Sequence, residues 1–395
     1  MSKSTTGATR RWLQAPQLRT VEHPGEDRRA TWLELFFDLV FVVAVAQLSN
    51  SLSKDVSIEG FLIFCGLFVP VWWAWVGYTF YADRFDTDDV VHRVLMLAGM
   101  FAAGGLASAV PGAAAGTGSR GFAIAYVAVR AIMLVLYARA WRALPAARPL
   151  VTGYMAGFAT AASLWLVSLA VPTPARYAVW AVALAIDLGT PLASRRNIAL
   201  VPVHTSHIPE RIGLFTLIVL GETVLAVVLG TESVSWSLDV ALVAAFGFAI
   251  GASFWWLYFD YVDTSLLRRS IWAGQLYLYS HLPLVAGLTA VGVGVKLAIK
   301  ETGAPGLPDG ARWVLCAGIA LAFGAVAVLH LATTRSRRDP DVWLRAGTAV
   351  LALVLAVAGG GLGPIVVVGV LAVALVGQVV VEVAAHERHA PSGAV

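Results

Sequence analysis

The chain is a succession of long apolar runs separated by short polar segments. Each run is about 20 residues long, the length that an α-helix needs to cross the hydrocarbon core of a bilayer. The glycine-rich segment 359–363 separates the last two runs, so eleven spans or a re-entrant pair are alternatives. The pattern predicts an all-α, polytopic membrane bundle of about twelve transmembrane helices, at residues 33–52, 58–81, 91–110, 120–142, 150–171, 175–193, 210–230, 238–260, 271–295, 311–332, 342–358 and 363–385.

Six spans lie on each side of a polar linker, and the two halves look related. The first span of each half begins with a glutamate and a phenylalanine, and the second carries Trp72-Trp73 in one half and Trp255-Trp256 in the other. Six spans return the chain to the same side of the membrane, so we expect two parallel six-helix repeats whose axis lies along the membrane normal. The predicted domains are a basic tail (1–30), a first repeat (31–193), a linker (194–209), a second repeat (210–385) and a second tail (386–395).

Composition excludes a soluble protein and charge sets the topology. Of 395 residues, 58% are apolar and 13% charged, whereas a soluble domain carries about 25% charged residues. A cytoplasmic N-terminus puts 21 lysines and arginines on the cytoplasmic side and six outside, with Arg130 inside a span. Under the positive-inside rule this distribution predicts a multi-pass protein of the cytoplasmic membrane with both termini cytoplasmic. The net charge of +4 therefore indicates orientation in the lipid bilayer, and no nucleic-acid partner is expected.

One carboxylate, Glu222, lies within the apolar run that follows Glu210. It is twelve residues beyond Glu210, roughly 18 Å along a helix axis and thus near the middle of the bilayer. Similar counting from the ends of their own spans places Arg130 and His281 about 15 Å deep. An ionisable group at this depth is costly and marks a functional site. We expect Arg130 and Glu222 to pair, with His281 nearby, as a site for a small solute or ion; the alternative is a structural ion pair.

A second candidate site lies in the first span. Glu34 and Asp38 are four residues apart and share one helix face, where two carboxylates suit a cation or a shared proton. In the alternative, Glu34 pairs with Arg28 or Arg29, and Asp38 caps or hydrogen-bonds a neighbouring helix.

Two polar segments border the spans. His204, His207 and Glu210 are spaced by three residues, which on a helix would suit a metal site, but Pro209 breaks the helix that such a site would need. We therefore expect His207 to cap a helix, and Glu210 to pair with Arg211 at the interface of the two halves. The other segment is acidic and basic at once. We expect a salt-bridged cytoplasmic loop there, with Arg93 paired to Asp89 on the next turn and a cation or phosphate site as the alternative; its members include Asp83, Asp86, Asp89, His92 and Arg93.

Three motifs resemble one known family, the bacterial low-temperature-requirement protein A family. They are Glu34-Leu-Phe-Phe-Asp-Leu-Val-Phe41, Phe85-Asp-Thr-Asp-Asp89 and the run from His207-Ile-Pro-Glu-Arg to Leu-Gly-Glu222, and the resemblance covers about residues 31–385. Ile212 departs from the aromatic residue expected there. The resemblance implies an integral membrane protein and assigns no chemistry. The start of the seventh span is also similar to the first-helix motif of twelve-span potassium channels built from two repeats.

These features favour a protein that moves a small solute or cation across the membrane. The sequence contains no nucleotide-binding loop, so coupling to a proton or cation gradient is expected, without a cofactor. No catalytic motif is evident, which makes a membrane-embedded enzyme the second choice. A stress-linked structural membrane protein is a third alternative, although it would have little need of buried charges. The oligomeric state stays open, with a homodimer as one alternative.

Overall fold

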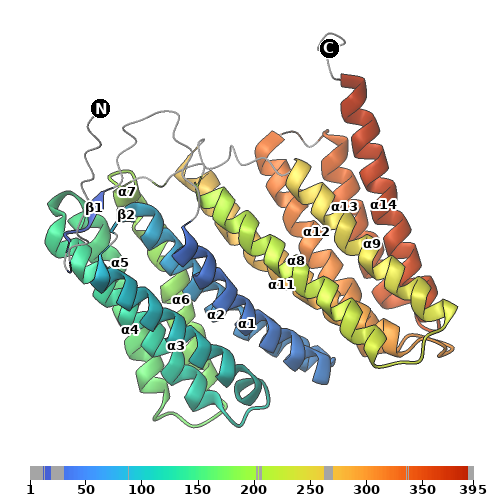
Figure 1. The fold of residues 1–395 in the computed structure, drawn as a ribbon, viewed down its shortest axis with the longest axis horizontal. Helices are drawn as coiled ribbons and strands as arrows, with labels where there is room; N and C mark the ends of the chain where they lie inside the picture. The colour runs from blue at the N-terminus through green and yellow to red at the C-terminus, as the bar shows by residue number, and fades with distance from the viewer. Residues whose placement is uncertain are drawn as a thin grey trace, which may run out of the picture. The chain divides into compact units, whose positions relative to one another are not determined.

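A computed structural model of the chain describes residues 12, 14–18, 31–87, 89–201, 203, 207–261, 270–334, 336 and 338–389. Each of the twelve predicted spans coincides with a long helix (Figure 1). These are α1 (Trp32–Lys54), α2 (Ile58–Arg84), α3 (Val90–Ala114), α4 (Ser119–Ala143), α5 (Arg148–Ser168), α6 (Ala175–Ala193), α8 (His207–Glu232), α9 (Leu238–Tyr261), α11 (Ile271–Lys300), α12 (Asp309–Thr334), α13 (Pro340–Ala358) and α14 (Pro364–His389).

Eleven helices in the described part of the chain are long and apolar enough to cross a membrane. The long helix outside this set is α6, which has 19 residues and carries two buried charged side chains, Arg176 and Asp187. The alternatives to twelve spans that the sequence offered, eleven spans or a re-entrant pair, concerned the last two spans. However, α13 and α14 are separate helices and both belong to the eleven. The predicted all-α membrane bundle is therefore confirmed.

The chain forms two compact units. Unit one contains residues 1–44 and 70–210, and unit two contains residues 45–69 and 211–395. The boundary falls within α1 and within α2 as well as near the linker. A division into compact units does not show whether the two six-helix halves resemble each other, so the pair of parallel repeats stays a prediction.

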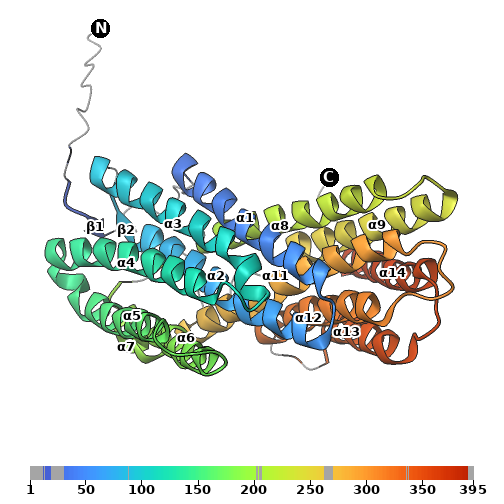
Figure 2. The same cartoon turned by 90° about the horizontal axis from the view of Figure 1, so that it is seen from below.

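In unit one, α2 supplies five buried aromatic side chains to the core. Trp72, Trp73, Trp75, Tyr78 and Tyr81 are each at most 2% exposed. Two of them bond to the backbones of other helices: the Tyr78 hydroxyl donates to the carbonyl of Val129 in α4, and the Trp73 indole N–H donates to the carbonyl of Asp187 in α6. The helices α3, α4, α5 and α6 then pack in chain order (Figure 2).

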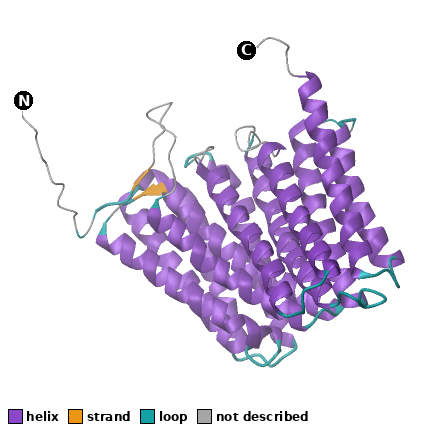
Figure 3. Ribbon diagram, turned by 45° about the vertical axis from the view of Figure 1, so that its right-hand side comes forward, coloured by secondary structure: helices purple, strands orange, loops and turns teal. Residues whose placement is uncertain are grey.

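A small antiparallel ribbon also belongs to unit one (Figure 3). It joins β1 (Gln17–Leu18) to β2 (Phe85–Asp86), with Gln17 opposite Asp86 and Leu18 opposite Phe85. The sequence predicted the first thirty residues as a tail and Asp86 as part of a loop. The ribbon instead ties part of that tail to the end of α2.

Unit two is built around α11. This helix packs against α12, α12 against α13, α13 against α14, α14 against α9 and α9 against α11, so these five helices form a ring. Glycines allow close approach at two contacts: Gly287 of α11 faces the backbone of Gly318 in α12, and Gly369 of α14 receives the Phe246 ring of α9. Along α8, Thr223 donates to the carbonyl of Leu288.

Candidate functional site

Three helix ends in unit one bring ionisable side chains together in a buried cluster. Glu34 and Asp38 come from the start of α1, Asp83 from the last turn of α2 and His207 from the first residue of α8. We call these four side chains, with Trp75, the His207 cluster; all five are at most 5% exposed. His207 Nδ1 lies 2.9 Å from Asp83 Oδ1, and His207 Nε2 lies 3.7 Å from Glu34 Oε2. An imidazole between two carboxylates from different helices can exchange a proton with either.

Glu34 also helps α1 to begin. Its carboxylate accepts the backbone N–H of Thr31 at 2.8 Å, and the Thr31 hydroxyl accepts the N–H of Glu34 at 3.3 Å. These two bonds make a capping box, for which the sequence signal is Thr-x-x-Glu. The sequence reasoning missed this signal, and its alternative partners, Arg28 and Arg29, lie outside the described residues.

Asp38 lies one turn deeper and is fully buried. Its Oδ1 accepts the indole N–H of Trp75 at 2.7 Å, so the predicted alternative of a hydrogen bond to a neighbouring helix describes this side chain. The partner of His207 was not predicted, because Asp83 had been assigned to a surface loop. His204 lies outside the described residues, so the His204–His207–Glu210 metal alternative is not tested.

Glu210 lies in the first turn of α8, as predicted, and Arg211 beside it is 1% exposed. Their predicted ion pair stays a prediction. Glu210 lies three residues after His207, where a helix N-terminus favours an anion.

Asp89 organises the loop between α2 and α3. Its carboxylate accepts the N–H groups of His92 at 2.6 Å and Gln14 at 2.7 Å, and lies 2.7 Å from Arg139 Nη2. Burial raises the pKa of Asp89, but these N–H groups and the Arg139 charge outweigh burial and hold the pKa below its usual value. Asp89 therefore caps α3 and forms an ion pair with Arg139 of α4, which the sequence did not predict. The predicted pairing of Arg93 with Asp89 stays a prediction.

A second polar cluster of unit one is enclosed among apolar side chains. Arg130 of α4 and Asp187 of α6 are fully buried, with Nη2 2.9 Å from Oδ2. The Tyr126 hydroxyl donates to the same Oδ2 at 2.6 Å and accepts from Arg130 Nη2 at 2.7 Å. The Arg130 guanidinium also lies over the Phe158 ring, 4.9 Å from its centroid. We call Arg130, Asp187 and Tyr126 the Arg130 triad.

The predicted partner of Arg130, Glu222, is therefore replaced by Asp187. Asp187 is a lone carboxylate in an apolar span, the same signal that singled out Glu222, and the sequence reasoning overlooked it. Counting residues along a helix gives the depth of a side chain but not the side of the helix on which it lies, so it could not decide whether Asp187 or Glu222 pairs with Arg130.

Glu222 lies in unit two and is half-buried, within the field of the Lys296 charge on α11. His281 is fully buried on α11. Its Nδ1 lies 2.6 Å from the carbonyl oxygen of Tyr277, which only accepts, so Nδ1 carries the proton. Nε2 then accepts the Tyr258 hydroxyl at 2.8 Å.

The prediction that Glu222 and His281 lie at one depth is wrong. Thr223, the neighbour of Glu222, bonds to Leu288, which is seven residues beyond His281 and about 10 Å further along α11. The depth of Glu222 was counted from Glu210, whereas α8 begins three residues earlier, at His207, so Glu222 is fifteen residues from the helix start and His281 is ten from the start of α11. Arg130 belongs to unit one and both Glu222 and His281 to unit two, and a site shared by all three stays a prediction.

Comparison with known proteins gives a family but no activity. The family model for the bacterial low temperature requirement A protein (LtrA) matches residues 29–380. A protein of Rhizobium meliloti (strain 1021), named "Uncharacterized protein RA0937", is 33% identical over 300 residues, which cover 69% of this chain and 71% of the relative. The residues matched by the family model include both the His207 cluster and the Arg130 triad. The chain belongs to the bacterial low temperature requirement A family of integral membrane proteins.

Proposed function

We propose that this protein moves a small solute or ion across the cytoplasmic membrane, driven by a proton or cation gradient. The observation that carries the proposal is the Arg130 triad, in which two opposite charges are fully buried. Arg130 lies eleven residues from the start of α4 and Asp187 twelve from the start of α6, so both are about 17 Å along their helices. A charge near the bilayer centre costs about 2.5–3.5 kcal/mol on insertion scales. A purely structural protein could fill this place with leucine.

The triad has capacity for a ligand. Among the described residues, Asp187 Oδ1 has no hydrogen-bond partner, and Arg130 Nη1 donates to a weak acceptor, Met133 Sδ, at 3.5 Å. One carboxylate oxygen and one guanidinium nitrogen are thereby left for a small polar solute or a cation. Gly77 of α2 packs against the same groups: a Cβ there would lie 2.8 Å from Met133 Sδ and 3.1 Å from Arg130 Nη1, so a ligand at Nη1 would have to displace the Met133 side chain.

The His207 cluster supports a gradient-coupled mechanism. With both termini cytoplasmic, as the distribution of lysine and arginine favours, the start of α1, the end of α2 and the start of α8 lie on the cytoplasmic side. His207 can then exchange protons with the cytoplasm, with Asp83 at 2.9 Å and with Glu34 at 3.7 Å, two carboxylates from two other helices. Asp38 continues this line of carboxylates one turn further into the membrane.

The test uses purified full-length protein in liposomes that enclose a pH-sensitive dye. Proton, Na⁺ or K⁺ gradients are imposed, and solutes are then added in classes. The key variant replaces both charges, Arg130→Met with Asp187→Leu, because removing a buried pair together leaves no stranded charge. The matched control is Arg345→Met with Glu382→Leu, a buried pair 2.8 Å apart in unit two.

We expect wild-type and control vesicles to show flux and the Arg130/Asp187 double variant to fold without it. Full flux in that variant would make the triad a structural ion pair. Wild-type vesicles that match empty liposomes under every gradient and solute would refute transport and favour the enzyme or the structural protein.

A further inference from the structure

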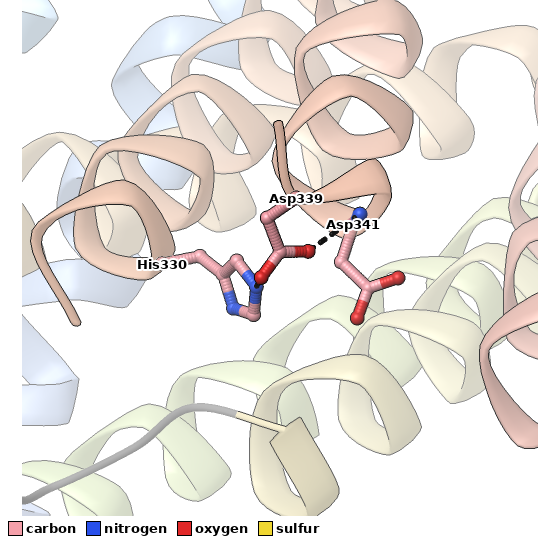
Figure 4. A group of neighbouring side chains, drawn as sticks. All are labelled: His330, Asp339 and Asp341. Carbon is pink, nitrogen blue, oxygen red and sulfur yellow. Dashed lines mark hydrogen bonds and ion pairs between the residues drawn. The ribbon is translucent and has the colours of Figure 1, made fainter. Parts of the chain in front are cut away.

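A group of potential metal ligands lies in unit two, away from both polar clusters. His330 is in the last turn of α12, Asp339 caps α13 and Asp341 is in the first turn of α13 (Figure 4). One donor atom from each side chain lies within 4.8 Å of the others. Among the described residues, these three side chains are the group of histidine, cysteine and acidic residues whose donor atoms lie close enough together to hold one metal ion.

The local backbone orients the central carboxylate. Asp339 Oδ1 accepts the N–H of Asp341 at 3.0 Å, and this bond leaves Oδ2 turned toward His330, 3.4 Å from Nε2 (Figure 4). Two donors that each bind one ion at about 2.1 Å lie about 3.0–3.4 Å apart in octahedral or tetrahedral geometry. The imidazole and the carboxylate are therefore spaced as ligands of a common ion.

The imidazole nitrogen supplies an independent observation. His330 Nε2 is enclosed and, within the described part of the chain, makes no hydrogen bond. The side chains of His330 and Asp339 are 13% and 23% exposed, so an ion can reach them from solvent while losing much of its hydration. An enclosed nitrogen that faces a carboxylate without a hydrogen bond suits a metal ligand.

The surrounding charge permits a cation. Arg345 is fully buried on α13, and its Nη2 is neutralised by Glu382 at 2.8 Å. Arg338, which immediately precedes Asp339, is exposed to solvent, where its charge is screened. The Gln378 amide nitrogen donates a hydrogen bond to the other Glu382 oxygen at 2.8 Å, and the Gln378 amide oxygen accepts one from the Thr348 hydroxyl at 2.7 Å. With Arg345 compensated in this way, Asp339 and Asp341 present two negative charges, which one divalent ion balances.

We propose that His330, Asp339 and Asp341 bind one divalent first-row transition-metal ion, Mn²⁺ or Zn²⁺, with water in the remaining positions. The imidazole ligand favours these ions over Mg²⁺ and Ca²⁺, which prefer oxygen donors. The ion joins the end of α12 to the start of α13. This proposal is independent of the transport proposal.

The test measures Mn²⁺ and Zn²⁺ binding to tag-free, chelator-treated full-length protein in detergent. Calorimetry gives stoichiometry and affinity, and pulsed electron paramagnetic resonance of bound Mn²⁺ detects a coordinated imidazole nitrogen. The variants are His330→Gln and Asp339→Asn; asparagine keeps the helix cap and removes only the ligand charge. Asp309→Asn is the matched control, because it removes an 81% exposed carboxylate from the other end of α12.

We expect one strong Mn²⁺ or Zn²⁺ site per chain, a nitrogen signal, and at least tenfold weaker binding in both variants but not in the control. Equal binding in wild type and His330→Gln would overturn the proposal. So would strong Mn²⁺ binding to the wild type without a nitrogen signal, or wild-type affinity no tighter than for Mg²⁺. In those cases His330 and Asp339 form only an ion pair.

Discussion

The contact between α11 and α12 allows a stability prediction whose sign depends on position. A Cβ added to Gly318 would lie 2.8 Å from two backbone atoms of α11, Gly287 O and Val291 N, whereas ordinary contacts are 3.4–4 Å. Backbone atoms do not rotate away, so Gly318→Ala must separate the helices by roughly half an ångström or more. Overpacking of this kind costs about 1–3 kcal/mol. Six residues further along α12, Gly324 has no atom within 4 Å of such a Cβ, and Gly324→Ala should stabilise the helix by about 0.5–1 kcal/mol.

A native thiol reports the effect. Cys316 is 0% exposed and lies two residues before Gly318, while the other cysteine, Cys65, is removed as Cys65→Ser. A thiol-reactive fluorophore then labels Cys316 only when α12 separates from its neighbours. If opening is at equilibrium, 1–3 kcal/mol corresponds to labelling about 5- to 150-fold faster for Gly318→Ala, and Gly324→Ala should label more slowly than the parent. Equal rates for the two alanine variants, or slower labelling of Gly318→Ala, would refute the packing argument.

Three other outcomes are expected. Because the pKa of Asp89 is held low, the stability that its carboxylate contributes is present above about pH 4 and is lost as the pH falls through the lowered pKa. The thermal unfolding temperature of Asp89→Asn should therefore depend less on pH between pH 3 and 7 than that of the wild type. Identical pH profiles of the two proteins would contradict this. Thr31→Ala breaks the capping box and should lower the unfolding free energy by about 1 kcal/mol, whereas Thr31→Ser should retain it; the comparison is made by chemical denaturation. A cysteine at the exposed Thr117, between α3 and α4, should react with an impermeant reagent in intact cells, and reaction only after permeabilisation would reverse the proposed topology.

Periodicity and length located the helices because each apolar span is bounded by polar residues, and the bounds of α6 and α9 differ from the prediction by at most one residue. The partners of the buried charges were not obtained in this way. Arg130 was identified as a buried charge, but its ion pair with Asp187 depends on which faces of α4 and α6 are in contact. His207 was assigned to capping, and its contact with Asp83 depends on three helix ends meeting. Such contacts join residues up to 124 positions apart, and no local pattern encodes them.

The ring of unit two bears on the order in which the protein is made. In unit one, α4, α5 and α6 each pack on the helix synthesised just before, so they can assemble as they leave the ribosome. In unit two, α9 packs on α14, the last helix of the chain, through Phe246 and Gly369. During synthesis α9 must therefore wait in the membrane, with this face covered by lipid or a chaperone, until α14 has been inserted. A chain that ends before α14 leaves the ring open, and quality-control proteases would meet that open face first.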